Sequence, residues 1–222
     1  MEEPKKISYI PEAFLEHRQL FPRSWVNQWV IPNPFISGLH EALSDYDVVL
    51  SDFAFAKDAA NVGDTALNLL IRKLNAGIKI GLDSISFTVA NPNWADATGL
   101  STALERTAEV VHRIVGDSPR SQETTLAFHV VAGSTDLTAA TAELVNTALF
   151  GQADFYGVSI NRHTGQLLIE KSVKYENAAF VRVQHRFSGG EAFSVIADKM
   201  YGEQLFSLQL LKLIEPEQTT LS

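Results

Sequence analysis

The order of the expected elements constrains this chain of 222 residues more than any single motif does. Runs rich in apolar residues occur at 46–58, 65–75 and 77–90, with only short turns between them. Strands joined by short turns pair antiparallel, because a parallel crossover needs a dozen or more residues. A helical pattern follows at 94–116, ending at a glycine. We therefore predict an α+β fold, with mainly antiparallel sheet and helices packed on one face.

The second part of the chain repeats this order of strand, helix, three strands and helix. The turn sequence LNAG at 74–77 precedes a strand in the first part, and ENAA at 176–179 precedes one in the second. The loop GDSPRS at 116–121 separates the two parts. We predict an internal duplication of a β-α-β-β-β-α unit. Its halves are residues 1–116 and 123–213, together forming one compact body, and a polar tail follows at 214–222.

The stretch GIKIGLDSISFTVA at 77–90 changes phase in its middle. Ile78 and Ile80 alternate in one register, whereas Phe87 and Val89 alternate in the opposite one. We interpret this stretch as a single strand with a β-bulge at Asp83 and Ser84, because a bulge reverses the parity beyond it. The functional alternative is that the bulge directs the Asp83 carboxylate into a pocket.

The composition excludes several classes of function. A formal charge of −8 argues against nucleic-acid binding, because phosphates require a basic surface. The chain contains no cysteine, so disulfides, thiol nucleophiles and Cys-ligated zinc are ruled out. The sequence shows no signal-peptide pattern and no apolar run of about 18 residues. We expect a soluble cytoplasmic protein that binds neither nucleic acid nor membrane.

Known catalytic and cofactor motifs do not occur in the sequence. It lacks the glycine-rich phosphate loops and the GxSxG nucleophile elbow, and its six histidines form no compact ligand pattern. We therefore expect no metal and no cofactor, and we leave open whether the protein is an enzyme. His129 and His185 lie on expected strands, and together with Asp83 they are the candidate polar site.

Two segments carry more apolar surface than a small domain needs. One contains Trp25, Trp29 and Phe35, and the other, at 205–213, contains Phe206 and Leu210. We take these five residues as the candidate interface or pocket, because aromatic residues concentrate at binding hot spots. A homodimer would cover the leucine-rich segment.

The sequence thus favours a non-catalytic binding or assembly protein that forms a homodimer or recognises a protein partner. The alternative is a carrier of an apolar small molecule, or an enzyme, with a pocket between a curved sheet and a helix. A cavity between sheet and helix would favour this alternative, whereas a filled interface would favour assembly.

Overall fold

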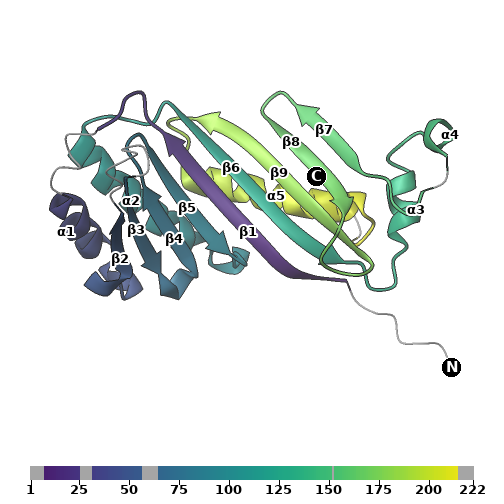
Figure 1. Ribbon diagram of the computed structural model, residues 1–222, viewed down its shortest axis with the longest axis horizontal. Helices are drawn as coiled ribbons and strands as arrows, with labels where there is room; N and C mark the ends of the chain where they lie inside the picture. Colours follow the sequence, from purple (N-terminus) through teal and green to yellow (C-terminus); the bar gives the residue numbers. More distant parts are fainter. Residues whose placement is uncertain (1–7, 26–31, 57–64, 152, 215–222) are drawn as a thin grey trace, which may run out of the picture. The chain divides into compact units, whose positions relative to one another are not determined.

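The computed structural model describes residues 8–25, 32–56, 65–151 and 153–214. Its described residues form one antiparallel sheet with the strand order β2-β3-β4-β5-β1-β6-β9-β8-β7, so the expected α+β class is confirmed (Figure 1). The strands are β1 (Tyr9–Leu20), β2 (Phe53–Ala56), β3 (Ala66–Ile71), β4 (Ala76–Ile80), β5 (Ser84–Ala90), β6 (Ser121–Val131), β7 (Val158–Arg162), β8 (Gly165–Lys171) and β9 (Ala178–Ser188).

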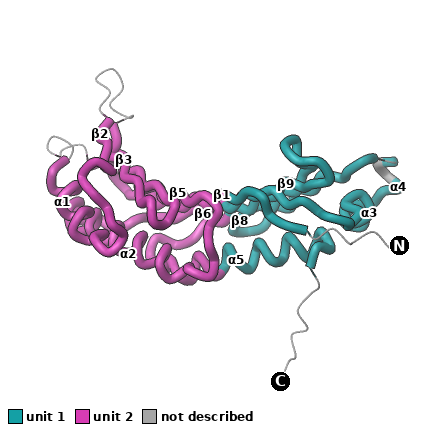
Figure 2. The backbone as a smooth tube through the Cα atoms, turned by 90° about the horizontal axis from the view of Figure 1, so that it is seen from below, with its two compact units in different colours: residues 1–13, 126–184, 199–222 teal, residues 14–125, 185–198 magenta. Residues whose placement is uncertain are grey.

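The chain divides into two compact units, which Figure 2 shows in different colours. Unit 1 comprises residues 1–13, 126–184 and 199–222. Unit 2 comprises residues 14–125 and 185–198. Strands β1, β6 and β9 and the last helix each have residues in both units.

In unit 2, helices α1 (Asn33–Ala42) and α2 (Ala97–Val115) cover one face of the strands (Figure 2). Helix α2 forms because apolar residues recur at helical spacing, so that Leu100, Leu104 and Val111 are all buried. It ends at Gly116, which adopts the left-handed conformation that favours glycine.

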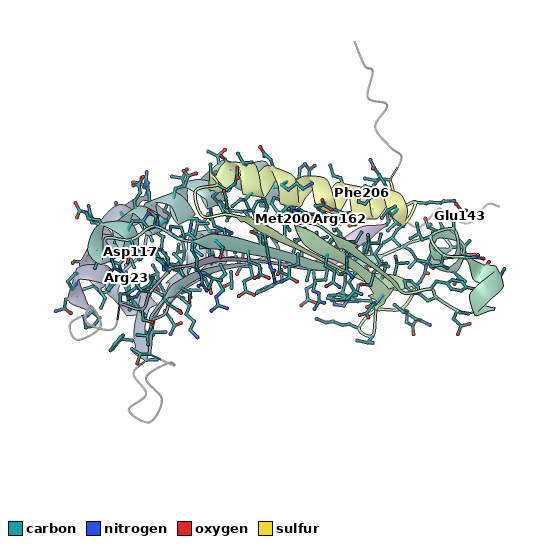
Figure 3. The ribbon with its side chains drawn as sticks, turned by 90° about the horizontal axis from the view of Figure 1, so that it is seen from above. Arg23, Asp117, Glu143, Arg162, Met200 and Phe206 are labelled. Atoms are coloured by element: carbon teal, nitrogen blue, oxygen red, sulfur yellow. The ribbon has the colours of Figure 1, made fainter. Side chains whose placement is uncertain are left out.

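In unit 1, strands β7 and β8 form a hairpin in which Arg162 lies opposite Gly165. Two short helices, α3 (Leu137–Ala142) and α4 (Thr147–Phe150), follow strand β6. Helix α5 (Phe193–Leu210), whose first six residues belong to unit 2, lies along one face of the strands in unit 1 (Figure 3). The Asp136 side chain begins α3 by accepting a hydrogen bond from the Ala139 N–H.

The bulge predicted at Asp83 and Ser84 is wrong. Residues 76–90 form two strands, β4 and β5, which pair antiparallel with Ile80 opposite Ile85. Residues opposite each other in an antiparallel pair point to the same face of the sheet. The phase change therefore comes from a hairpin turn, in which the odd spacing between Ile80 and Ile85 keeps both side chains in the core.

The strand order is the same in both parts of the chain. The first part has the order β1-β5-β4-β3, and the second has β6-β9-β8-β7, while β2 extends the first part by one edge strand. This agreement concerns order alone, and the duplication stays a prediction.

We predict that Leu39→Ala lowers the free energy of unfolding by about 2–5 kcal/mol, because it leaves a cavity where α1 packs in unit 2. Leu39 is 0% exposed, whereas Leu50 in the same unit is 65% exposed. The matched change Leu50→Ala should cost less than about 0.5 kcal/mol. Urea unfolding followed by circular dichroism measures both, and equal losses would contradict this assignment of the core.

Candidate functional site

A row of polar side chains occupies buried positions in the sheet of unit 2. His17 and Gln19 on β1, and Gln122 and Thr124 on β6, are all buried. Along β1 these positions continue the phase of Leu15, which belongs to the core. Buried polar groups cost free energy unless they are hydrogen-bonded.

Gln122 connects the sheet to the segment between β9 and α5. Its Nε2 lies 3.1 Å from the Ser188 carbonyl oxygen, 3.1 Å from that of Gly189 and 2.8 Å from that of Glu191. These oxygens can only accept hydrogen bonds, so the amide nitrogen must face them. The orientation of the Gln122 amide is thereby fixed.

The fixed Gln122 amide leaves one atom of Gln19 without a partner. Gln122 Oε1 points to β1, where it accepts a hydrogen bond from Gln19 Nε2 at 3.1 Å. Gln19 Oε1 then finds no hydrogen-bond partner among the described residues. Reversing the Gln19 amide would place two oxygen atoms against each other, so the arrangement has no better alternative.

A cavity of about 270 Å³ lies beside these two glutamines, between the sheet and α2. Helix α2 contributes Leu104, Glu105, Ala108, Glu109 and His112; the sheet contributes Gln19 and Gln122; the segment that ends β9 and begins α5 contributes residues 189–193. We call this the α2 cavity. Its lining contains three glutamates and, among the described residues, no lysine or arginine.

Two histidines beside this region also have an unpartnered nitrogen. His17 Nδ1 lies 2.9 Å from Thr124 Oγ1, while its Nε2 has no hydrogen bond of normal geometry within the described part of the chain. Burial lowers the pKa of His17 to about 4, although the Gln122 side chain favours the protonated form. Burial also lowers the pKa of His112, against the attraction of Glu109. His112 Nε2 is likewise unpartnered among the described residues.

The segment 189–192, which closes one side of the α2 cavity, depends on a glycine. A Cβ atom on Gly189 would lie 1.8 Å from the carbonyl oxygen of Pro119, which is too close for any side chain. A Cβ atom on Gly190 would meet nothing within 4 Å. Close backbone packing at Gly189 and the Gln122 amide together hold this segment in place.

The polar residues singled out from the sequence lie elsewhere. Asp83 is exposed in the turn between β4 and β5, where its carbonyl oxygen accepts the Phe21 N–H at 2.9 Å. His185 is buried in unit 2, with its ring 6.0 Å from that of Phe187. None of the candidate polar residues lines the α2 cavity.

His129, the third of these residues, belongs to unit 1. Its ring packs on those of Tyr175 and Phe180, and its Nδ1 lies 3.0 Å from Ser172 Oγ. Its neighbours include two aromatic rings and one hydroxyl, and its charge interacts with that of Glu12. This position is typical of a hydrogen-bonded structural histidine.

The aromatic candidates are divided between core and surface. Trp25 and Phe35 are buried in unit 2, and Trp25 Nε1 donates to the Gly81 carbonyl at 2.9 Å. Trp29 lies outside the described residues. Phe206 on α5 is 40% exposed, and the Arg162 guanidinium lies 5.3 Å from its ring centroid (Figure 3). Leu210 is partly exposed.

Arg162 also forms an ion pair inside unit 1. Its Nη1 lies 2.7 Å from both carboxylate oxygens of Glu203, which is buried, and Lys199 lies 3.0 Å from the same carboxylate. Burial raises the pKa of Glu203, but the hydrogen bonds from Arg162 and Lys199 outweigh it and hold the pKa below its usual value. The pairing of the buried carboxylate with two cations indicates a structural role.

The polar residues of the α2 cavity were missed by the sequence analysis, although a signal exists. In the segment LEHRQLF at 15–21, the residues Leu15, His17, Gln19 and Phe21 share one strand phase. A histidine and a glutamine on the apolar phase of a central strand mark a polar site in a core. Their partner Gln122 lies about a hundred residues away, and only the fold brings it near.

Comparison of the sequence with models of known protein families found no match, and a search among curated proteins found no significant relative. Within the described residues, no three histidine, cysteine, aspartate or glutamate side chains lie together so as to hold a metal ion. Among the helices that the structure describes, none has the length and apolar composition needed to cross a bilayer.

We predict that His17 makes the protein less stable in acid. The unfolded chain protonates His17 near its ordinary pKa of 6.5, whereas the folded chain does so near 4. Between these values the unfolded state binds more protons, so the free energy of unfolding falls as the pH falls, by about 3 kcal/mol in total. Urea unfolding between pH 7 and pH 4.5 measures most of this loss. His17→Gln should remove most of it, and His40→Gln, at an exposed position of α1, should retain it. Equal pH profiles for wild type and His17→Gln would contradict the prediction.

We predict that the two glutamines differ in their effect on stability. Gln122→Leu removes the donor to three carbonyl groups and should cost about 1–3 kcal/mol. Gln19→Leu removes one hydrogen bond but also removes an unpartnered oxygen, so its net cost should stay below about 1 kcal/mol. Denaturant unfolding of both variants tests this order, and a larger cost for Gln19→Leu would show that the hydrogen-bond assignment is wrong.

Proposed function

We propose that this chain is a small-molecule-binding protein whose ligand occupies the α2 cavity. The observation that carries this proposal is the lining of the α2 cavity, in which six of the twelve residues have polar side chains, the buried Gln19 and Gln122 among them. Polar side chains at core positions depart from the rule of apolar cores, and natural chains make such departures mainly at functional sites.

The dimensions of the α2 cavity support a small ligand. A volume of about 270 Å³ equals the share of about nine water molecules in the liquid and lies near the lower limit of typical ligand pockets. Glu105 and Glu109 are exposed on α2, whereas Gln19 and Gln122 are buried beneath. Charged groups are therefore at the mouth and amides are at the floor.

This proposal corresponds to the alternative stated from the sequence, a carrier or enzyme with a pocket between sheet and helix, with one change. From the sequence we expected an apolar pocket between sheet and helix, whereas half of the residues lining the α2 cavity have polar side chains. A polar or charged ligand fits such a lining better than an apolar one, because an apolar ligand would leave the polar groups without partners.

The function in binding or assembly and the homodimer, both expected from the sequence, stay predictions. In the segment 205–213, Leu208 and Leu211 are buried within the chain, while Phe206 is exposed beneath Arg162. Less apolar surface is therefore left for a partner than the sequence pattern indicated, and this observation favours the ligand-binding proposal over assembly.

We predict that Ala108→Leu abolishes ligand binding, because it places three additional carbon atoms in the α2 cavity. The measurement is thermal unfolding with a panel of small amines, guanidines, alcohols, amides and carboxylic acids. At least one chemical class should raise Tm in the wild-type protein, since a ligand that binds only the folded state stabilises it. The same class should have no effect on Ala108→Leu.

The control is Ala97→Leu, which adds the same atoms at the start of α2, outside the cavity lining. It should respond to the panel as the wild type does. If Ala108→Leu does not fold, Ala108→Val, which adds fewer atoms, replaces it as the cavity-filling variant. The proposed function would be contradicted if no chemical class changed the Tm of the wild-type protein, or if a class raised the Tm of the wild type and of all the variants equally.

A further inference from the structure

We infer that unit 2 has a second binding site, on the face of its sheet opposite α1 and α2, for a doubly charged oxyanion group of a small molecule, such as a phosphate monoester. This site shares no lining residue with the α2 cavity, so the inference does not rest on the proposed function. Two cationic side chains without a counter-ion carry it, together with the depression in which they lie.

The two cations and a serine form one row across three strands. Along β4, Ile78 and Ile80 are buried in the core and Lys79 between them is exposed, so Lys79 points to the opposite face of the sheet. Ser86 on β5 lies directly opposite Lys79 on one side and directly opposite Arg18 of β1 on the other. Residues opposite each other point to the same face, so the serine lies between the two cations.

A depression of about 730 Å³ lies over this row. We call it the β5 trough, because Ser84, Ser86 and Thr88 of β5 belong to its lining, with Arg18 and Lys79 on the neighbouring strands. Serine side chains are short, whereas those of arginine and lysine are long, so the row is hollow at its centre. The volume of the trough lies within the range of typical ligand pockets.

Neither cation in the β5 trough has a counter-ion. Arg18 and Lys79 form no ion pair with a carboxylate of the described residues, whereas Arg72, also in unit 2, pairs with Asp52 at 2.9 Å. Neighbouring strands lie about 4.8 Å apart, so the backbones that carry the two cations are about 10 Å apart. An anion over Ser86 can therefore contact both side chains at once.

Two carboxylates in the lining define where the anion fits. Glu16 lies opposite Thr88, and Asp83 lies in the turn that precedes β5. The row at Ser86 lies between these two positions, so an anion there is closest to the cations. A doubly charged group balances both cations, whereas a carboxylate balances one. The Arg18 guanidinium can bind a phosphate group through two parallel hydrogen bonds, and the Ser86 hydroxyl can donate a further one.

Isothermal titration calorimetry of the full chain at pH 7.5 and low ionic strength tests this inference. The probes are inorganic phosphate and glycerol 3-phosphate, which both carry nearly two negative charges at this pH. The comparison compounds are glycerate, which has one carboxylate on a similar skeleton, and glycerol, which has no charge. We expect both phosphate compounds to bind, the comparison compounds to bind at least tenfold more weakly, and added salt to weaken the phosphate binding.

Variants assign the binding to the row. Arg18→Gln and Lys79→Gln should each weaken glycerol 3-phosphate binding by about three- to tenfold, as for exposed charged hydrogen bonds, and the double variant should abolish it. Ser86→Val fills the centre of the row and should also abolish it. Arg113→Gln, which removes an exposed cation from α2, is the matched control and should bind as the wild type does.

The outcomes separate this inference from the proposed function. Ala108→Leu, which fills the α2 cavity, should leave phosphate binding unchanged. Loss of phosphate binding in Ala108→Leu, together with its retention in the double variant, would place the anion in the α2 cavity and overturn the inference. Equal binding of glycerate and the phosphate compounds, phosphate binding unchanged in the double variant, or no binding of either phosphate compound would overturn it as well. None of the last three results bears on a ligand in the α2 cavity.

Discussion

The hydrogen bonds of Gln122 hold together the part of unit 2 on which the candidate site depends. One side-chain nitrogen lies within hydrogen-bonding distance of the carbonyl groups of Ser188, Gly189 and Glu191, and the oxygen of the same amide accepts from Gln19. A single residue of β6 thus fixes the path of the chain between β9 and α5 and the orientation of an amide on β1. The position of one wall of the α2 cavity therefore depends on this one group.

The row of buried polar side chains in the sheet lowers the stability of unit 2, and the apolar residues of the unit must offset this loss. His17, Gln19, Gln122 and Thr124 occupy positions where apolar side chains would stabilise the sheet–helix interface. The apolar residues around them, such as Phe87 and Leu104, are nearly completely buried and supply that stabilisation. Natural chains depart from the rule of apolar cores mainly at functional sites, where local stability is lost for the sake of a ligand.

The sequence predicted much of the fold because local patterns report local structure. The helix at 94–116 has apolar residues at helical spacing and a terminal glycine, and the structure places α2 at Ala97–Val115. The class of fold followed from short turns between strands. The stretch 77–90 was misread because a bulge and a short hairpin turn both reverse the phase of alternation. Only the pairing of Ile80 with Ile85 distinguishes them, and pairing is a property of the folded sheet.

For the candidate site, too, some features follow from the sequence and others only from the tertiary structure. The sequence by itself determined the absence of cysteine, the negative charge and the α+β class. It also places His17 and Gln19 on an otherwise apolar strand phase, but the meaning of this pattern became clear only with the fold. Only the tertiary structure decided that Gln122, from 103 positions farther along the chain, lies against Gln19, and that residues 189–193 close a cavity beside them. The physical reason is that an amide has both a donor and an acceptor, and which of its atoms remains unpartnered depends on neighbours that the fold brings from distant parts of the sequence.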